Sequence, residues 1–133
     1  MGVKFINMII DVLIRIKNAQ AVKKEIVKIP YSRINTDMLE VLVKNGYLDS
    51  VSKKGRGIKK YLEVKLKYEN KEGVIRGVKL ISKPSVRYYS GYKDLLKVKS
   101  GYGLGIISTP QGIMTYQEAR KKHLGGERIC EIW

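Results

Sequence analysis

The residues best suited to binding chemistry in this sequence are short hydroxyls that stand beside glycines. Segment 101–115 reads GYGLGIISTPQGIMT, in which Ser108 and Thr109 end an apolar run and Gly112 follows them. Glycine lacks a Cβ, so such a loop can bring its backbone and short polar side chains very close to a ligand. Gly112 stands where a turn needs a positive φ, which glycine adopts without strain. The pattern predicts hydrogen bonding to a ligand.

Three enzyme-like features of the sequence do not complete a catalytic or metal site. The glycines of 101–105 have the wrong spacing for a dinucleotide-binding loop, and a strand is expected after them. Ser108 has no nearby histidine that could act as its base. Cys130 and His123 are single residues of their kind, too few for a zinc site or an intramolecular disulfide. The sequence therefore predicts no enzyme, no cofactor, no metal and no small-molecule substrate.

The charge of the chain predicts a polyanionic partner. The net charge is +15 over 133 residues, and residues 51–100 carry 15 of the 27 Lys and Arg side chains but only 4 of the 12 acidic ones. Lys53, Lys54 and Arg56 fall in a flexible basic hairpin loop expected at 52–57. Such a cluster attracts phosphates without regard to sequence, whereas contacts to bases and sugars specify a site. A membrane is the weaker alternative, because the charge does not lie on an amphipathic helix.

The elements that must position these residues begin with a helix within the apolar segment 5–16. Asn7 can cap its start, and the segment is too short to span a bilayer, which needs ~20 residues. No cleavage site of a signal peptide follows it. Arg15 and Lys17 point outward from the buried stripe of this helix. From the residues alone, a solvated face and a binding face are equally good interpretations of these two cations.

Alternation of apolar and polar residues, together with turn residues between the alternating segments, predicts the rest of the fold. Strands are expected at 24–30 with Ile26 inward, at 47–51, at 61–68, at 74–82 and at 86–89, and a second helix runs from Ser32 to Asn45-Gly46. Thr115-x-x-Glu118 predicts a capping box that starts a short helix. The last strand, 127–133, is expected to carry Glu127 and Glu131 on one face. The turn at 83–85 predicts a boundary between subdomains 1–83 and 84–133.

The order of these elements predicts an α+β fold. An N-terminal α-β-α-β-β unit is expected to pack on a small C-terminal antiparallel sheet with a short helix.

Several motifs stand in the order found in one known family. They are the segments Gly103–Ile106 (GLGI), Ser108–Thr115 (Ser-Thr-x-x-Gly-x-Met-Thr), Glu118–Arg120 (EAR), Gly125–Glu127 (GGE) and Asp11–Ala19 (DVLIRIKNA). Together they resemble the bacterial form of the eighth small-subunit ribosomal protein family. The resemblance extends over both halves of the chain.

The resemblance implies a structural constituent of the small ribosomal subunit. Such a protein would bind the central domain of small-subunit rRNA early in assembly, beside other small-subunit proteins, in the ribosomes of the cytoplasm or of an organelle. The implied recognition residues are Ser108, Thr109, Pro110, Gly112 and Glu127. A carboxylate such as that of Glu127 can accept a hydrogen bond from a base amino group.

Further family positions add to this expected RNA surface. Arg87 and Tyr89 match a family motif in the segment PSVRYY, and an aromatic face can stack on an exposed base. By the same resemblance, Arg15 and Lys17 look like contacts to the rRNA backbone. A free regulatory protein that binds messenger RNA would use the same surface and is the first alternative. A nonspecific DNA-compacting protein is the second, and it would show no preference for a folded rRNA junction.

The recognition loop departs from the family pattern. The family has Ser-Thr-Ser-Lys-Gly where this chain has Ser-Thr-Pro110-Gln111-Gly. Proline offers neither a hydroxyl nor an N–H, so one hydrogen bond attributed to that position cannot form. Its fixed φ lowers the ordering entropy that the loop loses on binding.

Overall fold

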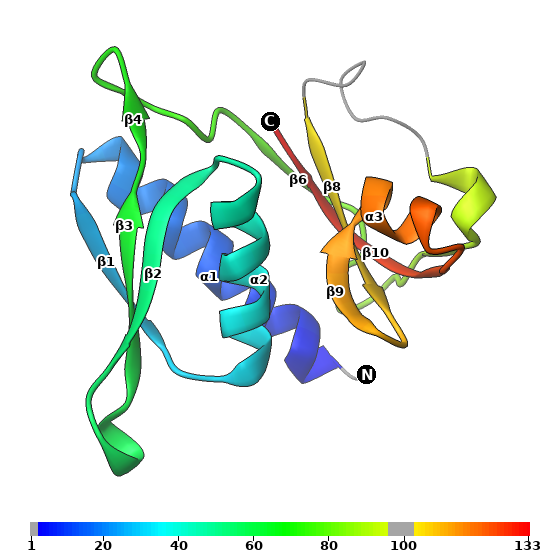
Figure 1. Ribbon diagram of the computed structural model, residues 1–133, viewed down its shortest axis with the longest axis horizontal. Coiled ribbons are helices and arrows are strands. Elements are labelled where there is room, and N and C mark those ends of the chain that lie inside the picture. The colour runs from blue at the N-terminus through cyan, green and yellow to red at the C-terminus, as the bar shows by residue number, and fades with distance from the viewer. Residues whose placement is uncertain (1–2, 96–102) are drawn as a thin grey trace. The chain divides into compact units, whose positions relative to one another are not determined.

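The computed structural model describes residues 3–95 and 103–133, so Gly101 and Tyr102 of the glycine-rich segment lie outside the described residues. Its helices are α1 (Val3–Ala21), α2 (Arg33–Lys44) and α3 (Tyr116–Lys121), with 3-10 turns η1 (Gly57–Lys59) and η2 (Tyr92–Asp94). The strands are β1 (Ile26–Pro30), β2 (Leu48–Lys54), β3 (Tyr61–Leu66), β4 (Tyr68–Glu69), β5 (Glu72–Gly73), β6 (Val78–Leu80), β7 (Tyr89–Ser90), β8 (Leu104–Thr109), β9 (Gly112–Thr115) and β10 (Gly126–Ile132). These helices and antiparallel sheets confirm the predicted α+β class (Figure 1).

The chain forms two compact units, each with its own sheet. The first is Met8–Ile75, and the second is Arg76–Trp133, to which the start of α1 also belongs. The division into 1–83 and 84–133 stays a prediction about where the chain can be separated. β6 already pairs with the last strand, β10.

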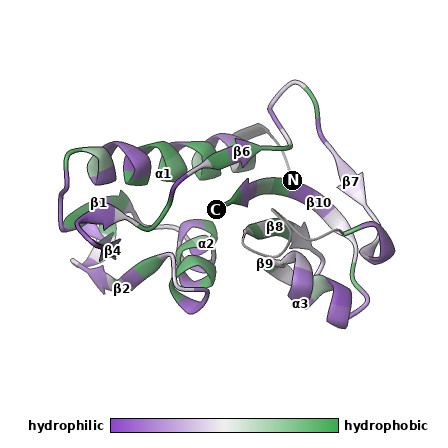
Figure 2. Ribbon diagram, turned by 90° about the horizontal axis from the view of Figure 1, so that it is seen from above, coloured by the Kyte–Doolittle hydropathy of each residue, from purple (hydrophilic) through white to green (hydrophobic). Residues whose placement is uncertain are grey.

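The first unit has the predicted α-β-α-β-β order around a three-stranded antiparallel sheet of order β1-β3-β2. Leu62, Val64 and Leu66 of the central strand are buried, which confirms the alternation expected for 61–68. Hydrophobic and hydrophilic residues alternate around α1 and α2 (Figure 2). This pattern gives each helix one apolar face and one face for water.

Local signals set the ends of α2 as predicted, but not the start of α1. The Ser32 hydroxyl accepts a hydrogen bond from the Asn35 N–H at 3.0 Å, which caps α2. Gly46 follows the helix with φ +83°, as a left-handed residue there should. α1 begins at Val3, so the prediction that Asn7 caps it is wrong. Asn7 lies inside the helix instead.

The pairing of β1 with β3 corrects the predicted orientation of Ile26. Ile29 pairs with the buried Leu62 and is itself fully buried, whereas Ile26 pairs with the exposed Lys65 and remains 45% exposed. Paired residues of an antiparallel sheet share a face. The strand therefore turns Ile26 to the solvent side.

The second unit is built on a five-stranded sheet. Its order is β6-β10-β8-β9, with β7 also pairing with β10. The Thr115 hydroxyl accepts from the Glu118 N–H at 3.1 Å, which confirms the predicted cap of α3. The core beneath α3 contains Leu95, Ile107, Met114, Tyr116 and Ala119. The predicted strands 74–82 and 86–89 are realised only as the shorter β6 and β7.

An irregularity in β10 changes which side chains share a face. Glu127 pairs with Ser108, but the register shifts between Arg128 and Cys130, and Glu131 pairs with Gly105. Because Ser108 and Gly105 face opposite sides of β8, Glu127 and Glu131 also face opposite sides. The prediction that they share a face is wrong. Complete burial of Cys130 raises the pKa of its thiol to about 12, so the thiol stays protonated at neutral pH.

Candidate nucleic-acid interface

Three of the predicted recognition residues form one row across the second sheet. Glu127 of β10 pairs with Tyr89 of β7 on one side and with Ser108 of β8 on the other. Directly paired residues in antiparallel strands direct their side chains to the same face. The fold thus brings together three positions that are far apart in the sequence. We call Tyr89, Glu127 and Ser108 the recognition row.

Arg87 holds the carboxylate at the centre of the recognition row. Its Nη2 donates to Glu127 Oε1 at 2.8 Å, and its Nε donates to Glu127 Oε2. Glu127 is only 4% exposed, so its charge needs a partner. Hydrogen bonding to Glu127 raises the pKa of the Arg87 guanidinium, which keeps the pair charged and fixed. The row therefore presents no uncompensated negative charge to an anionic ligand.

A buried serine fixes the segment that carries Arg87 and Tyr89. The Ser82 hydroxyl donates to the Arg128 carbonyl at 2.6 Å and accepts from the Tyr88 N–H at 3.0 Å. The Arg128 N–H in turn donates to the Tyr88 carbonyl at 2.9 Å. Sequence reasoning missed both Ser82 and the pairing of Arg87 with Glu127. A serine inside an expected strand gives no local signal, and 40 residues separate the ion-pair partners.

The two hydroxyls that end β8 have different environments. Ser108 belongs to the recognition row, whereas Thr109 is the next residue and faces the other side. The Thr109 hydroxyl donates to the Gly112 carbonyl at 2.9 Å and accepts from the Gln111 N–H at 3.2 Å. Thr109 therefore braces the turn to β9, in which Pro110 is exposed. Gly112 has φ +119°, which confirms the predicted positive φ.

Tyr89 is the accessible end of the recognition row. Tyr89 is 69% exposed, whereas Glu127 and Ser108 are each 4% exposed. An exposed ring on a rigid strand can stack on a base with little loss of conformational freedom. The buried members hold the strands that present this ring.

The predicted phosphate contacts belong to the first unit. Lys54 and Arg56 are exposed, and so is Lys53, whose Nζ lies 4.6 Å from the ring centroid of Tyr31. Lys53 and Lys54 are part of β2 rather than of a flexible loop. Arg15 and Lys17 are exposed on α1 as predicted.

Metal clusters and membrane-spanning helices are both absent from the described residues. In residues 3–95 and 103–133, no three His, Cys, Asp or Glu side chains are placed to hold a metal ion. Over the same ranges, no helix is long and apolar enough to cross a bilayer.

Comparison with known proteins gives one consistent result. The family model described as ribosomal protein S8 matches residues 7–133. The small ribosomal subunit protein uS8 of Mycoplasma mobile is 46% identical over 125 residues, which cover 94% of both chains. The proteins of the same name from Clostridium beijerinckii and Dictyoglomus thermophilum are 42% and 43% identical, over 94% of this chain and 96% and 95% of theirs. The family resemblance expected from the motifs is thereby confirmed.

Proposed function

Because the chain belongs to the ribosomal protein S8 family, we propose that it is a primary rRNA-binding constituent of the small ribosomal subunit. It binds the central domain of the rRNA, helps assemble the subunit and contacts neighbouring small-subunit proteins. The relatives named above are bacterial, which supports a place in the cytoplasmic ribosome. They are also structural proteins of the ribosome, which agrees with the prediction that the chain is not an enzyme.

The recognition row is the observation that supports this proposal most strongly. It joins an exposed aromatic ring at Tyr89 to a neutralised ion pair, Arg87–Glu127. In the adjacent turn Pro110 is exposed, and Gly112, two residues later, has a positive φ. Folded RNA is recognised largely through its shape, its 2′-hydroxyls and its splayed bases, which a rigid and nearly neutral surface of this kind can read.

The cations of the first unit supply affinity of another kind. Lys53, Lys54, Arg56, Arg15 and Lys17 carry exposed positive charges, which contact phosphates. Contacts of this type hold RNA of any sequence and weaken as salt rises. The proposal thus assigns selection of the RNA site to the recognition row and general attraction to RNA phosphates to the cations of the first unit.

Binding to defined RNAs tests the proposed function. The purified protein is expected to bind a transcript of the rRNA central domain much more tightly than an unrelated duplex of equal length at the same salt. It should also co-sediment with small subunits after a high-salt wash. Equal affinity for both RNAs would contradict the proposal and favour a nonspecific nucleic-acid binder. Selective binding without co-sedimentation would favour the regulatory messenger-binding alternative.

The basic hairpin predicts a specific change in salt dependence. If about five phosphates are contacted, the logarithm of affinity should fall with the logarithm of salt at a slope of about −4, because each contact contributes about 0.7–0.9. Replacing Lys53, Lys54 and Arg56 by glutamine should make the slope shallower by about 2, without changing the ratio of affinities for cognate and unrelated RNA. Titrations from low to moderate salt measure this slope. An unchanged slope would place the phosphate contacts elsewhere.

A further inference from the structure

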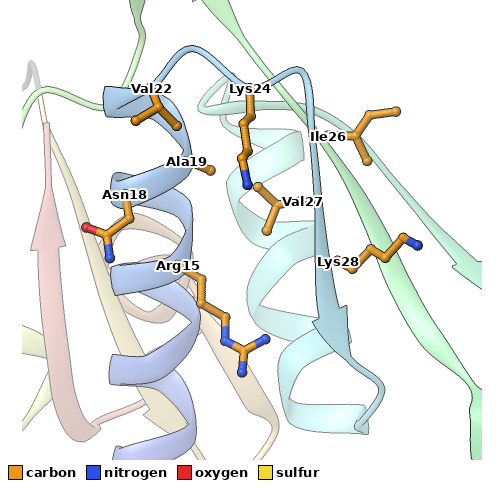
Figure 3. Close-up of a pocket in the computed structure, with 8 residues that line it drawn as sticks. All are labelled: Arg15, Asn18, Ala19, Val22, Lys24, Ile26, Val27 and Lys28. Atoms are coloured by element: carbon orange, nitrogen blue, oxygen red, sulfur yellow. The ribbon is translucent and has the colours of Figure 1, made fainter.

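A groove of about 830 Å³ lies between α1 and β1. Its lining comes from the end of α1, the connection after it and the first half of β1, all within the first unit. Figure 3 shows Arg15 and Lys24 pointing into the space between helix and strand. The eight lining residues are Arg15, Asn18, Ala19, Val22, Lys24, Ile26, Val27 and Lys28. The volume falls within the range typical of sites for small organic groups, about 300–1,000 Å³.

The walls of the groove leave apolar surface open to water. Val22 is 68% exposed, and Val27 of β1 points toward the helix, whereas Ile26 lies at the outer edge of the groove and points away from α1 (Figure 3). Exposed aliphatic side chains carry a cost in water that a bound group would remove. Half of the lining side chains are aliphatic, so the groove accepts a group with a flat or apolar body.

The polar side chains of the groove select for an anion. Of its charged lining residues, Arg15 and Lys24 point into the space, whereas Lys28 points away from α1 and its Nζ lies 5.2 Å from the ring centroid of Tyr61 (Figure 3). No carboxylate is among the eight described residues that line the groove. Arg15 pairs with Asp11 at 3.0 Å, but both side chains are about half exposed, so this pair contributes little and is easily exchanged. Asn18 adds an exposed amide, with both donor and acceptor atoms, at the outer rim of the groove on the side of α1 away from β1 (Figure 3).

Hydrogen bonds keep the groove open in the free protein. After α1 ends, the Lys23 N–H donates to the Gln20 carbonyl and the Lys24 N–H to the Ala19 carbonyl, both at 3.0 Å. The Tyr68 hydroxyl donates to the Lys24 carbonyl at 2.5 Å. These bonds tie the connection to both the helix and the sheet side, so little ordering is needed on binding.

We propose that this groove binds one unpaired nucleotide of the RNA. Arg15 and Lys24 hold its phosphate, Val22 covers one face of its base or ribose, and the Asn18 amide bonds to the edge of the base. Unpaired bases in folded RNA are the groups whose edges and faces proteins can read in this way. The inference rests on the proposed function, because it names a second contact point on the same RNA.

A paired substitution in the groove tests the proposal. The variant carrying Asn18→Ala and Val22→Ser removes the amide and the apolar cover, and both positions are exposed, so the fold should survive. We expect affinity for the central-domain transcript to fall about tenfold, the size of one lost base contact. Base-specific chemical probing should show one unpaired nucleotide that the unaltered protein protects and the variant leaves reactive. The remaining footprint should not change.

Ile14→Ser is the matched control. Ile14 is an exposed aliphatic residue on α1, one turn before Asn18, and it does not line the groove. Its replacement should therefore leave affinity and footprint unchanged. An equal loss in the control, or no loss in the groove variant, would overturn the inference while leaving the selectivity of the unaltered protein intact. If the groove variant bound RNA normally but failed to associate with other subunit proteins, the inference would also be overturned. The groove would then bind an acidic peptide of a neighbouring protein rather than a nucleotide. Loss of RNA selectivity in the unaltered protein would remove the proposed function itself.

Discussion

Replacing Gly126 by alanine is expected to lower the free energy of unfolding by about 3 kcal/mol or more. A Cβ at this position would lie 1.9 Å from the Ser108 carbonyl oxygen and 2.9 Å from its carbonyl carbon. Both atoms belong to the backbone of a paired strand, so no side chain can rotate away to make room. A loss of this size should lower the melting temperature by roughly 10 °C or more, measured by circular dichroism.

Gly91→Ala provides the control for that substitution. An added Cβ there would meet nothing closer than the Asp94 carboxylate at 3.9 Å, and Gly91 has φ −74°, which any residue adopts. We expect a change within about 0.5 kcal/mol. If Gly126→Ala melted at the same temperature as Gly91→Ala, β8 and β10 would not approach each other as closely as described here.

Replacing Tyr89 by alanine is expected to weaken binding to the rRNA central domain by about tenfold to a hundredfold. Stacking of one base on an aromatic side chain contributes about 1–3 kcal/mol. Because Tyr89 is mostly exposed, the change should leave the melting temperature almost unaltered. Affinity measured by filter binding, together with a thermal melt of each variant, separates recognition from stability.

Two further variants make the test of Tyr89 specific. Tyr89→Phe keeps the ring and should retain most of the affinity if stacking is the contact. Tyr88→Ala removes a neighbouring tyrosine that is 47% exposed but lies outside the recognition row, and it should change affinity little. Equal losses at both positions would indicate general attraction by surface aromatics rather than a defined stacking position.

The features of the fold that were predicted correctly depend on a few neighbouring residues. The caps at Ser32 and Thr115, and the positive φ values of Gly46 and Gly112, follow from chemistry within three or four positions of the chain. The alternation of strand 61–68 was predictable because its two faces differ clearly in polarity. The motifs also identified the family, whose model matches residues 7–133.

The features that were missed depend on pairing between distant segments. Whether Ile26 or Ile29 faces the core is decided by register with β3, and a one-residue slip reverses every side chain of a strand. The shift in β10 that separates Glu127 from Glu131 is likewise set by β8. The ion pair of Arg87 with Glu127 joins the segment just before β7 to β10, and only the folded sheet brings these two parts of the chain together.

The same dependence on distant pairing applies to the two hydroxyls that end β8. Two consecutive hydroxyls at 108 and 109 look equivalent in the sequence. Strand geometry gives them different tasks, one in the recognition row and one in the turn that Gly112 closes.

The position of β10 in the chain determines when the second sheet can exist during synthesis. β6, β7 and β8 all precede β10, and each of them pairs with it. None of these pairings can form until the ribosome making the chain has added residues 126–132, whereas the three-stranded sheet of the first unit is complete by residue 66. Domains fold as they emerge, from the N-terminal side onward. A chain whose translation stops before β10 therefore carries the basic first unit without the recognition row. Under the proposed function, such an unfinished copy keeps the residues assigned to phosphate attraction and lacks those assigned to site selection.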